Sequence, residues 1–321
     1  METISVRKLT KRYGKLLAVD GISLDIRKGE IFGLLGPNGA GKSTTLLMLS
    51  TLLAPTSGSA TVNGHDIRTE PAAVRDSIGM VFQDPSSDEL LTAYENLKLH
   101  ALMYDVPLRE IDRRIDDALG LVDLRGRKND QVKKYSGGMR RRMEIARGLL
   151  HEPAVLFLDE PTIGLDPQTR KHIWEYIRGL ASRREMTIIL TTHYMEEADQ
   201  LCDRVAIIDG GRIVALGAPA ELKAGIKGDL VTLTGKALKL SGVQKLPFVQ
   251  AVERNGGKAC IHVTDAAKNL PRLLRVAGAV DSVEVHSPDF DDVFLRYTGK
   301  AIRDGDADAT EYMRTMARAK K

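Results

Sequence analysis

At 321 residues, with 43% hydrophobic and 28% charged residues, the chain has the composition of a soluble globular protein, which excludes the disordered and fibrous classes. Its 47 basic and 43 acidic residues leave a formal net charge of +4, which gives no strong case for nucleic acid or an acidic substrate. The longest apolar runs fall far below the roughly 20 residues of a membrane-spanning helix, so the chain is not expected to cross a bilayer by itself.

The first two thirds of the sequence alternate between strand and helix patterns. Residues 2–35 read as β-structure and end in the continuous apolar run Ile31–Leu35, which predicts a strand buried on both faces. Between about 87 and 150, apolar residues recur at steps of three or four, which predicts an inserted helical subdomain. Strand-like segments separated by helical stretches return from Val155 onward, as in a parallel sheet with covering helices. We therefore predict an α/β domain over residues 1–225.

The pattern changes again after this domain. Short strands and short helices alternate over residues 226–299, which predicts a small separate α+β domain. Near its end, Ser287 as N-cap and Pro288 at the first helical position predict the start of a helix, with Asp289 near the positive end of the helix dipole. Residues 300–321 are rich in charge and poor in large apolar side chains, which predicts a frayed, charged tail.

A glycine-rich loop between the apolar run and a helical pattern is the strongest local signal. Glycines let backbone N–H groups curl around a phosphate, Lys42 brings a positive charge to the β and γ oxygens, and Ser43 offers a hydroxyl to Mg²⁺. The alternative is an ordinary glycine-rich turn at a strand end. The strand, loop and helix setting favours a phosphate-binding loop formed by Gly36, Pro37, Asn38, Gly39, Ala40, Gly41, Lys42, Ser43 and Thr44.

Two carboxylates follow the apolar strand Val155–Leu158, at the strand end where ligands bind in open α/β sheets. Asp159 can hold Mg²⁺ through water, and Glu160 can accept a proton from a water molecule that attacks a γ-phosphate. The alternative is an exposed acidic turn, which the phosphate loop upstream disfavours.

A second potential phosphate contact lies inside the helical block. Ser136, Gly137 and Gly138 stand at the start of an apparent helix, where unpaired N–H groups suit an anion. The plain alternative is a capped helix with Ser136 as its N-cap, and these residues alone favour that interpretation.

Together these motifs resemble the nucleotide-binding subunit of an ATP-binding cassette (ABC) transporter over residues 3–225. The resemblance implies a P-loop NTPase of the ABC type with an inserted helical subdomain, and it implies that ATP and Mg²⁺ are bound. It also implies that Ser136, Gly137 and Gly138 bind the γ-phosphate of ATP held by a second, facing subunit. Two subunits would then enclose two nucleotides head to tail.

The same resemblance assigns further residues. Tyr13 would stack on adenine, Gln83 would touch Mg²⁺ and relay toward the membrane partner, and His193 would contact the γ-phosphate beside the catalytic Glu160. Asp166 would lie in a loop that crosses the dimer interface. The structural alternatives are a core or surface tyrosine, a solvated amide, a histidine satisfied at a strand end, and a plain Asp-Pro turn.

Two segments are similar to the daunorubicin-resistance branch of drug exporters. One is Tyr135–Met139 followed by three arginines, and the other is Ser287–Leu295 in the small domain. Tyr135 and Met139 stand where the commonest family form has Leu and Gln, so a side-chain amide is lost while the serine and glycines remain. The branch implies efflux of a drug or other lipophilic compound through separate transmembrane subunits, with a homodimer or a paralogous ATPase as partner. It leaves dimer stabilisation or regulation as hypotheses for the small domain.

Two other functions compete with export. A soluble cassette ATPase acting on ribosomes or DNA would usually carry two cassettes, a long coiled coil or zinc-binding cysteines, whereas Cys202 and Cys260 form no such motif. A nucleotide-binding regulator without turnover is disfavoured by the presence of both Glu160 and His193. The cysteine usage and the absence of a leader pattern predict a cytoplasmic location. The resemblance implies that this location is the cytoplasmic face of the membrane, for a chain that is soluble when expressed alone and has no nucleic-acid partner.

Overall fold

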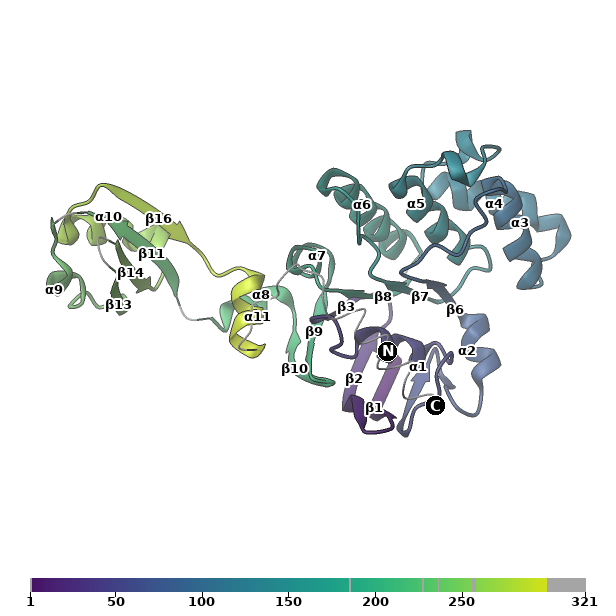
Figure 1. The fold of residues 1–321 in the computed structure, drawn as a ribbon, viewed down its shortest axis with the longest axis horizontal. Helices are drawn as coiled ribbons and strands as arrows, with labels where there is room; N and C mark the ends of the chain where they lie inside the picture. Colours follow the sequence, from purple (N-terminus) through teal and green to yellow (C-terminus); the bar gives the residue numbers. More distant parts are fainter. Residues whose placement is uncertain (1, 185, 227, 236, 256–257, 299–321) are drawn as a thin grey trace. The chain divides into compact units, whose positions relative to one another are not determined.

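The structure is a computed structural model that describes residues 2–184, 186–226, 228–235, 237–255 and 258–298. These residues form two compact units, one ending at Ala218 and one beginning at Pro219 (Figure 1). The observed boundary precedes the predicted one at 225, because helix α8 (Pro219–Ala224) packs on helix α11 (Phe290–Thr298) of the second unit. The tail predicted for residues 300–321 lies outside the described residues.

A six-stranded sheet, with the order β10-β9-β3-β8-β7-β6, forms the centre of the first unit. All neighbouring strands are parallel except β10, which is antiparallel to β9. Every residue of β3, β7 and β8 is buried, as expected for strands covered on both faces. The α/β class is therefore confirmed. The strands are β3 (Ile31–Leu35), β6 (Ile78–Val81), β7 (Val155–Asp159), β8 (Thr187–Thr192), β9 (Arg204–Asp209) and β10 (Arg212–Gly217).

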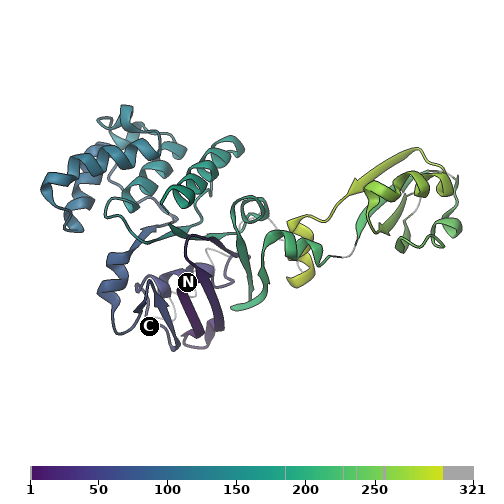
Figure 2. The same ribbon diagram turned by 180° about the vertical axis from the view of Figure 1, so that it is seen from behind.

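An antiparallel sheet of order β2-β1-β4-β5 covers part of the central sheet (Figures 1 and 2). Its apolar residues, such as Ile4 and Ile26, share one core with Phe32 of the central sheet and Leu46 of the first helix. This packing fixes the start of that helix against the end of β3. The elements are β1 (Glu2–Tyr13), β2 (Leu16–Arg27), β4 (Ser57–Val62), β5 (His65–Asp66), α1 (Lys42–Leu49) and α2 (Pro71–Ser77).

A helical layer lies between β6 and β7 in the sequence, within the stretch 87–150. The first of its helices starts at a capping box, in which the Thr92 hydroxyl accepts a hydrogen bond from the Glu95 amide and the Glu95 carboxylate accepts one from the Thr92 amide. Two further helices precede β8 and β9. The helices are α3 (Ala93–Met103), α4 (Leu108–Leu121), η1 (Arg125–Arg127), η2 (Val132–Lys134), α5 (Gly137–Gly148), α6 (Pro167–Arg184) and α7 (Met195–Leu201).

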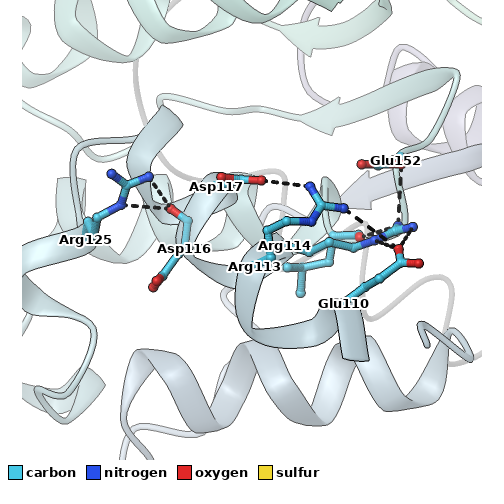
Figure 3. A network of polar contacts seen from close by, with 8 residues as sticks. Glu110, Arg113, Arg114, Asp116, Asp117, Arg125 and Glu152 are labelled. Atoms are coloured by element: carbon cyan, nitrogen blue, oxygen red, sulfur yellow. Dashed lines mark hydrogen bonds and ion pairs between the residues drawn. The ribbon is translucent and has the colours of Figure 1, made fainter. Parts of the chain in front are cut away.

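Helix α4 shows how the helical period divides buried from solvated residues. Its apolar side chains at 111, 115 and 119 are buried, while its other face carries the ion pairs of Figure 3. Arg113 pairs with Asp117 at 3.1 Å, and Arg114 pairs with Glu110 at 2.8 Å. Exposed pairs at this spacing contribute only about 0.3–0.5 kcal/mol each. Arg114 also donates to the Leu150 carbonyl, which ties α4 to the segment before β7.

The second unit is an antiparallel sheet of order β13-β14-β11-β16 with a β12-β15 pair, and its core includes residues of α10. The predicted helix start at Ser287 and Pro288 is wrong. The Asp289 carboxylate instead accepts a hydrogen bond from the Asp292 amide at 3.0 Å, and Asp292 reciprocates at 3.1 Å, so α11 begins at Phe290. The remaining elements are β11 (Asp229–Thr234), β12 (Ala237–Leu238), β13 (Val249–Asn255), β14 (Lys258–Val263), β15 (Gly278–Ala279), β16 (Ser282–His286), α9 (Leu240–Val243) and α10 (Ala266–Ala277).

Among the residues that the structure describes, no helix combines the length and the apolar composition required to traverse a lipid bilayer.

Candidate active site

The glycine-rich loop connects the end of β3 to the start of α1. A Cβ atom added at Gly36 would lie 2.3 Å from the Ile208 carbonyl oxygen, and one at Gly41 would lie 2.5 Å from the Ala18 carbonyl oxygen. Gly41 also has a φ of 106°, a left-handed value that favours glycine, and it is the N-cap of α1. The loop therefore offers bare backbone at a helix N-terminus, where the helix dipole favours an anion.

Lys42 is buried inside this loop. Its Nζ donates hydrogen bonds to the carbonyl oxygens of Gly36 at 2.8 Å and Pro37 at 3.1 Å, and it lies 3.6 Å from Oε1 of Glu160. Burial lowers the pKa of Lys42, while the charges of Glu160 and Asp159 act in the opposite direction. A buried ammonium group needs such partners, and a phosphate in the same loop would supply more negative charge.

Asp159, at the end of β7, is tied to two hydroxyl groups. The Ser43 Oγ donates to its Oδ1 at 2.9 Å, and the Thr191 Oγ1 donates to the same oxygen. The Thr191 hydroxyl in turn accepts the Glu160 amide at 2.9 Å. Hydroxyl and carboxylate oxygens are the ligands that Mg²⁺ prefers, so these side chains fit a magnesium ion beside the phosphate loop.

Glu160 lies between two basic side chains. Its Oε1 is 3.3 Å from Nδ1 of His193 and 3.6 Å from Nζ of Lys42. Burial raises the pKa of Glu160, but the His193 imidazole and the Lys42 ammonium outweigh this effect, so its pKa lies below the usual value. The carboxylate is therefore charged at neutral pH, as a group that accepts a proton must be.

Sequence reasoning missed two residues around this carboxylate pair. Thr191 is hydrogen-bonded to both Asp159 and Glu160. The pair of threonines that ends β8 could have indicated this role, because β8 lies beside β7 and Thr191 stands opposite Asp159. Arg141, from α5, donates to the carbonyl oxygens of Asp159 at 2.8 Å and Pro161 at 2.7 Å. Nothing in the local sequence distinguishes Arg141 from the arginines on either side of it.

The Ser136–Gly138 turn and Asp166 both cap helices. The Ser136 Oγ accepts the Met139 amide at 3.2 Å at the start of α5, and the Asp166 carboxylate accepts the Thr169 amide at 3.0 Å and its hydroxyl at 2.6 Å at the start of α6. The cap expected as the plain alternative for Ser136 is thus present, and Asp166 caps a helix as well. Ser136 and Gly137 are nevertheless exposed, and no hydrogen bond or ion pair between described residues links this turn to the phosphate loop.

The structure gathers only part of the predicted site into one bonded group. Lys42, Ser43, Asp159, Glu160 and His193 lie together at the carboxyl edge of the central sheet. Gln83 follows β6, is exposed, and lines a cleft whose other walls include the Ser136–Gly138 turn and the loop after β7. Tyr13 ends β1 half-buried, with the Lys11 ammonium 5.1 Å from its ring centre. The predicted roles of Tyr13 and Gln83 remain predictions.

Comparison with known proteins identifies the family. The sequence model of the family "ABC transporter" matches residues 19–163. The daunorubicin resistance ATP-binding protein DrrA3 of Streptomyces coeruleorubidus is 41% identical over 303 residues, which cover 92% of this chain and 96% of the relative. The linearmycin resistance ATP-binding protein LnrL of Bacillus subtilis is 40% identical, over 94% of this chain and all of the relative. Alignments of this length extend into the second unit.

Solved structures agree with the sequence relatives. The cbiO1 subunit of the cbiONQ ABC transporter complex of Clostridium perfringens superposes with a TM-score of 0.65 and 33% identity, over 70% of this chain and 91% of that one. The dimeric post-hydrolysis structure of the ATP-binding cassette MJ0796 with ADP and phosphate gives 0.61 and 28%, over 67% and 98%. The resemblance inferred from the motifs is therefore confirmed: the chain belongs to the ATP-binding subunits of ABC transporters and is an ATPase.

Proposed function

We propose that this ATPase uses Glu160 as its general base and closes as a head-to-tail dimer around two ATP molecules to drive an exporter. The observation that supports this most strongly is the grouping of Glu160, His193 and Lys42 within 3.3–3.6 Å beside the glycine loop. Each of these side chains has a separate task at a γ-phosphate.

The phosphates of ATP would bind in the loop that contains Lys42. The ammonium group would turn from the loop carbonyls toward the β and γ oxygens, which replaces neutral acceptors by charged ones. Ser43 and Asp159, with Gln83 as the predicted third residue, would hold Mg²⁺, which when bound neutralises charge on the phosphate oxygens. The bare backbone at Gly36 and Gly41 supports this fit, because a side chain there would collide with neighbouring carbonyls.

Hydrolysis would proceed by proton transfer to Glu160. A water molecule placed in line with the γ-phosphate gives one proton to the carboxylate while its oxygen bonds to the γ-phosphorus, and the bond between the γ-phosphorus and the bridging oxygen breaks to release ADP and phosphate. His193, 3.3 Å from Glu160, would orient the carboxylate and contact the γ-phosphate. The lowered pKa of Glu160 keeps the carboxylate ionised at the pH of the cell interior.

The Ser136–Gly138 turn would complete the site of a second copy. Its serine and first glycine are exposed and unconnected to the phosphate loop of their own chain within the described residues. The dimer of MJ0796 with ADP and phosphate supports a two-chain arrangement. Asp166, which caps α6, would lie in a loop that crosses the same dimer interface.

Export through separate transmembrane subunits is supported by the relatives. Two are named as antibiotic-resistance ATP-binding proteins, and another, from Cupriavidus pinatubonensis, as a Nod factor export ATP-binding protein at 39% identity over 94% of this chain and 92% of its own. A lipophilic drug or antibiotic is therefore the proposed cargo class, and the cytoplasmic face of the membrane the proposed location. The comparisons offer no support for action on ribosomes or DNA.

An exposed apolar face on α3 suits a cytoplasmic segment of the transmembrane subunit. Leu99, Leu102 and Met103 lie at spacings of three and four and are 54%, 45% and 72% exposed. Leu108, at the start of α4, is 76% exposed. Single exposed leucines are ordinary, but a group on one helix face indicates a partner surface.

Replacing two of these side chains tests the proposed partner. When co-expressed with its transmembrane subunits, the double variant Leu99→Glu with Met103→Glu should lose co-purification and transport, while the isolated chain keeps its basal ATPase. Leu52→Glu is the matched control, since Leu52 is 53% exposed and lies outside α3. Unchanged transport by the double variant, or co-purification of ribosomes in place of membrane subunits, would contradict the proposal.

Tyr13→Ala tests the predicted adenine contact. Stacking of an aromatic ring on a base is worth about 1–3 kcal/mol, so the Kd for ATP should rise roughly 5- to 150-fold while kcat at saturating ATP stays unchanged. Tyr13→Phe should retain the affinity, because the ring face is kept. Titration with a fluorescent ATP analogue measures the Kd of both variants, and steady-state hydrolysis measures kcat. An unchanged Kd in Tyr13→Ala would assign the ring a structural role.

A further inference from the structure

Arg141, on helix α5, is a buried charged residue that donates hydrogen bonds to three backbone carbonyl groups. Its side chain is only 6% exposed. Nε donates to the Pro161 carbonyl at 2.7 Å, Nη2 donates to the Asp159 carbonyl at 2.8 Å, and Nη1 donates to the Phe82 carbonyl. A planar guanidinium group can reach three acceptors in fixed directions, which an ammonium group cannot do.

The three carbonyls flank the two side chains that the reaction needs. Asp159 and Pro161 stand on either side of Glu160, and Phe82 precedes Gln83. Glu160 has a φ of 45°, a sparsely populated conformation for a residue other than glycine, which persists only where the surroundings hold it. Arg141 holds the Asp159 carbonyl directly before this strained residue and the Pro161 carbonyl one residue after it.

Helix α5 also holds the segment that follows Gln83. The Glu144 carboxylate accepts the Ser87 amide at 3.1 Å, and Arg147 pairs with Glu144 at 2.6 Å and donates to the Ser86 hydroxyl. The C-terminal end of the helix also packs closely on β6, because a Cβ at Gly79 would lie 2.2 Å from the Gly148 carbonyl oxygen. The helix that begins with the Ser136–Gly138 turn is therefore hydrogen-bonded to the backbone around Glu160 and to the segment around Gln83.

We propose that Arg141 is a positioning residue that fixes Glu160 and Gln83 in one arrangement and joins both to α5, the helix that begins at the Ser136–Gly138 turn. The inference rests on the roles proposed above for Glu160 and Gln83. A shift of α5 when its exposed turn meets the nucleotide of a second copy would pass through Arg141 to the backbone around both side chains.

Arg141→Lys separates this role from general stability, because it keeps the charge and removes the three-way reach. In the full chain, the Kd for ATP should stay within about twofold, while kcat per ATP-binding site falls roughly 10- to 100-fold, as expected when reacting groups are misplaced by about an ångström. Arg142→Lys is the matched control, because Arg142 donates to the Val122 carbonyl and the Tyr176 hydroxyl. The kcat of this variant should be unchanged.

The split between binding and turnover is a readout that separates a positioning role from a structural one. A structural defect weakens ATP binding and turnover together, whereas a misplaced Glu160 slows turnover alone. An unchanged kcat would overturn the inference. So would loss of ATP binding together with turnover, which would make Arg141 a support of the whole fold. Glu160→Gln, measured in parallel, tests the proposed function separately. Full ATPase activity in that variant would contradict the role of Glu160 itself.

Discussion

Glu160→Gln is expected to bind ATP as tightly as the unchanged chain and to hydrolyse it at least 10²–10⁴ times more slowly, the usual loss when a general base is removed. Glutamine has nearly the same shape, so the backbone bond to Thr191 can persist, but its amide cannot take the proton of the attacking water. Phosphate release under single-turnover conditions measures the chemical step, and nucleotide titration measures binding.

A matched control accompanies this variant. Glu175→Gln changes the same functional group at an exposed position of α6, and its turnover should be unchanged. Full activity in Glu160→Gln would mean that another group accepts the proton, and the role proposed for Glu160 would be withdrawn. Weakened ATP binding without slower chemistry would contradict it equally.

Lys42→Ala is expected to act on binding. Removing one partner of a buried, hydrogen-bonded charge pair costs about 2–5 kcal/mol, so the Kd for ATP should rise by a factor on the order of 30 to several thousand. The change also removes the ammonium group beside Glu160. The buried carboxylates of Glu160 and Asp159 would then face the phosphates with no lysine charge between them. Isothermal titration or a fluorescent nucleotide measures the Kd.

Lys245→Ala, an exposed lysine of the second unit, is the control for loss of one positive charge, and its Kd should not change. Thermal unfolding shows whether the Lys42→Ala protein is folded, so that its Kd can be compared with that of the unchanged chain. An unchanged Kd in a folded Lys42→Ala protein would exclude this loop as the phosphate site.

The features that sequence could predict are those set by neighbours along the chain. The run Ile31–Leu35 has no polar residue, so it had to lie in a sheet covered on both faces, and the glycines after it had to form a turn. The same reasoning applies to β7 and the two carboxylates at its end. The Ser136 cap also follows from local sequence, because the hydroxyl and the amide it accepts are three residues apart.

The features that sequence could not predict depend on residues that meet only in the fold. Arg141 joins α5 to peptide groups at Phe82 and Pro161, and no periodicity singles it out among three consecutive arginines. The left-handed backbone of Glu160 likewise reflects its surroundings. The helix start misassigned to Ser287 shows a local competition, because Asp289 and Asp292 cap each other and thereby override the Ser-Pro signal.

Head-to-tail closure around ATP is tested most directly with Glu160→Gln, in which the closed state is not dissipated by hydrolysis. Light scattering after gel filtration should show a monomer without nucleotide and a dimer with ATP and Mg²⁺, containing one bound ATP per chain. Adding Ser136→Arg should prevent the dimer while leaving ATP bound, because Ser136 is exposed and its bulkier replacement would block the facing phosphate. A Glu160→Gln protein that binds ATP yet stays monomeric at high concentration, or whose ATP is enclosed by a single chain, would contradict the two-chain site.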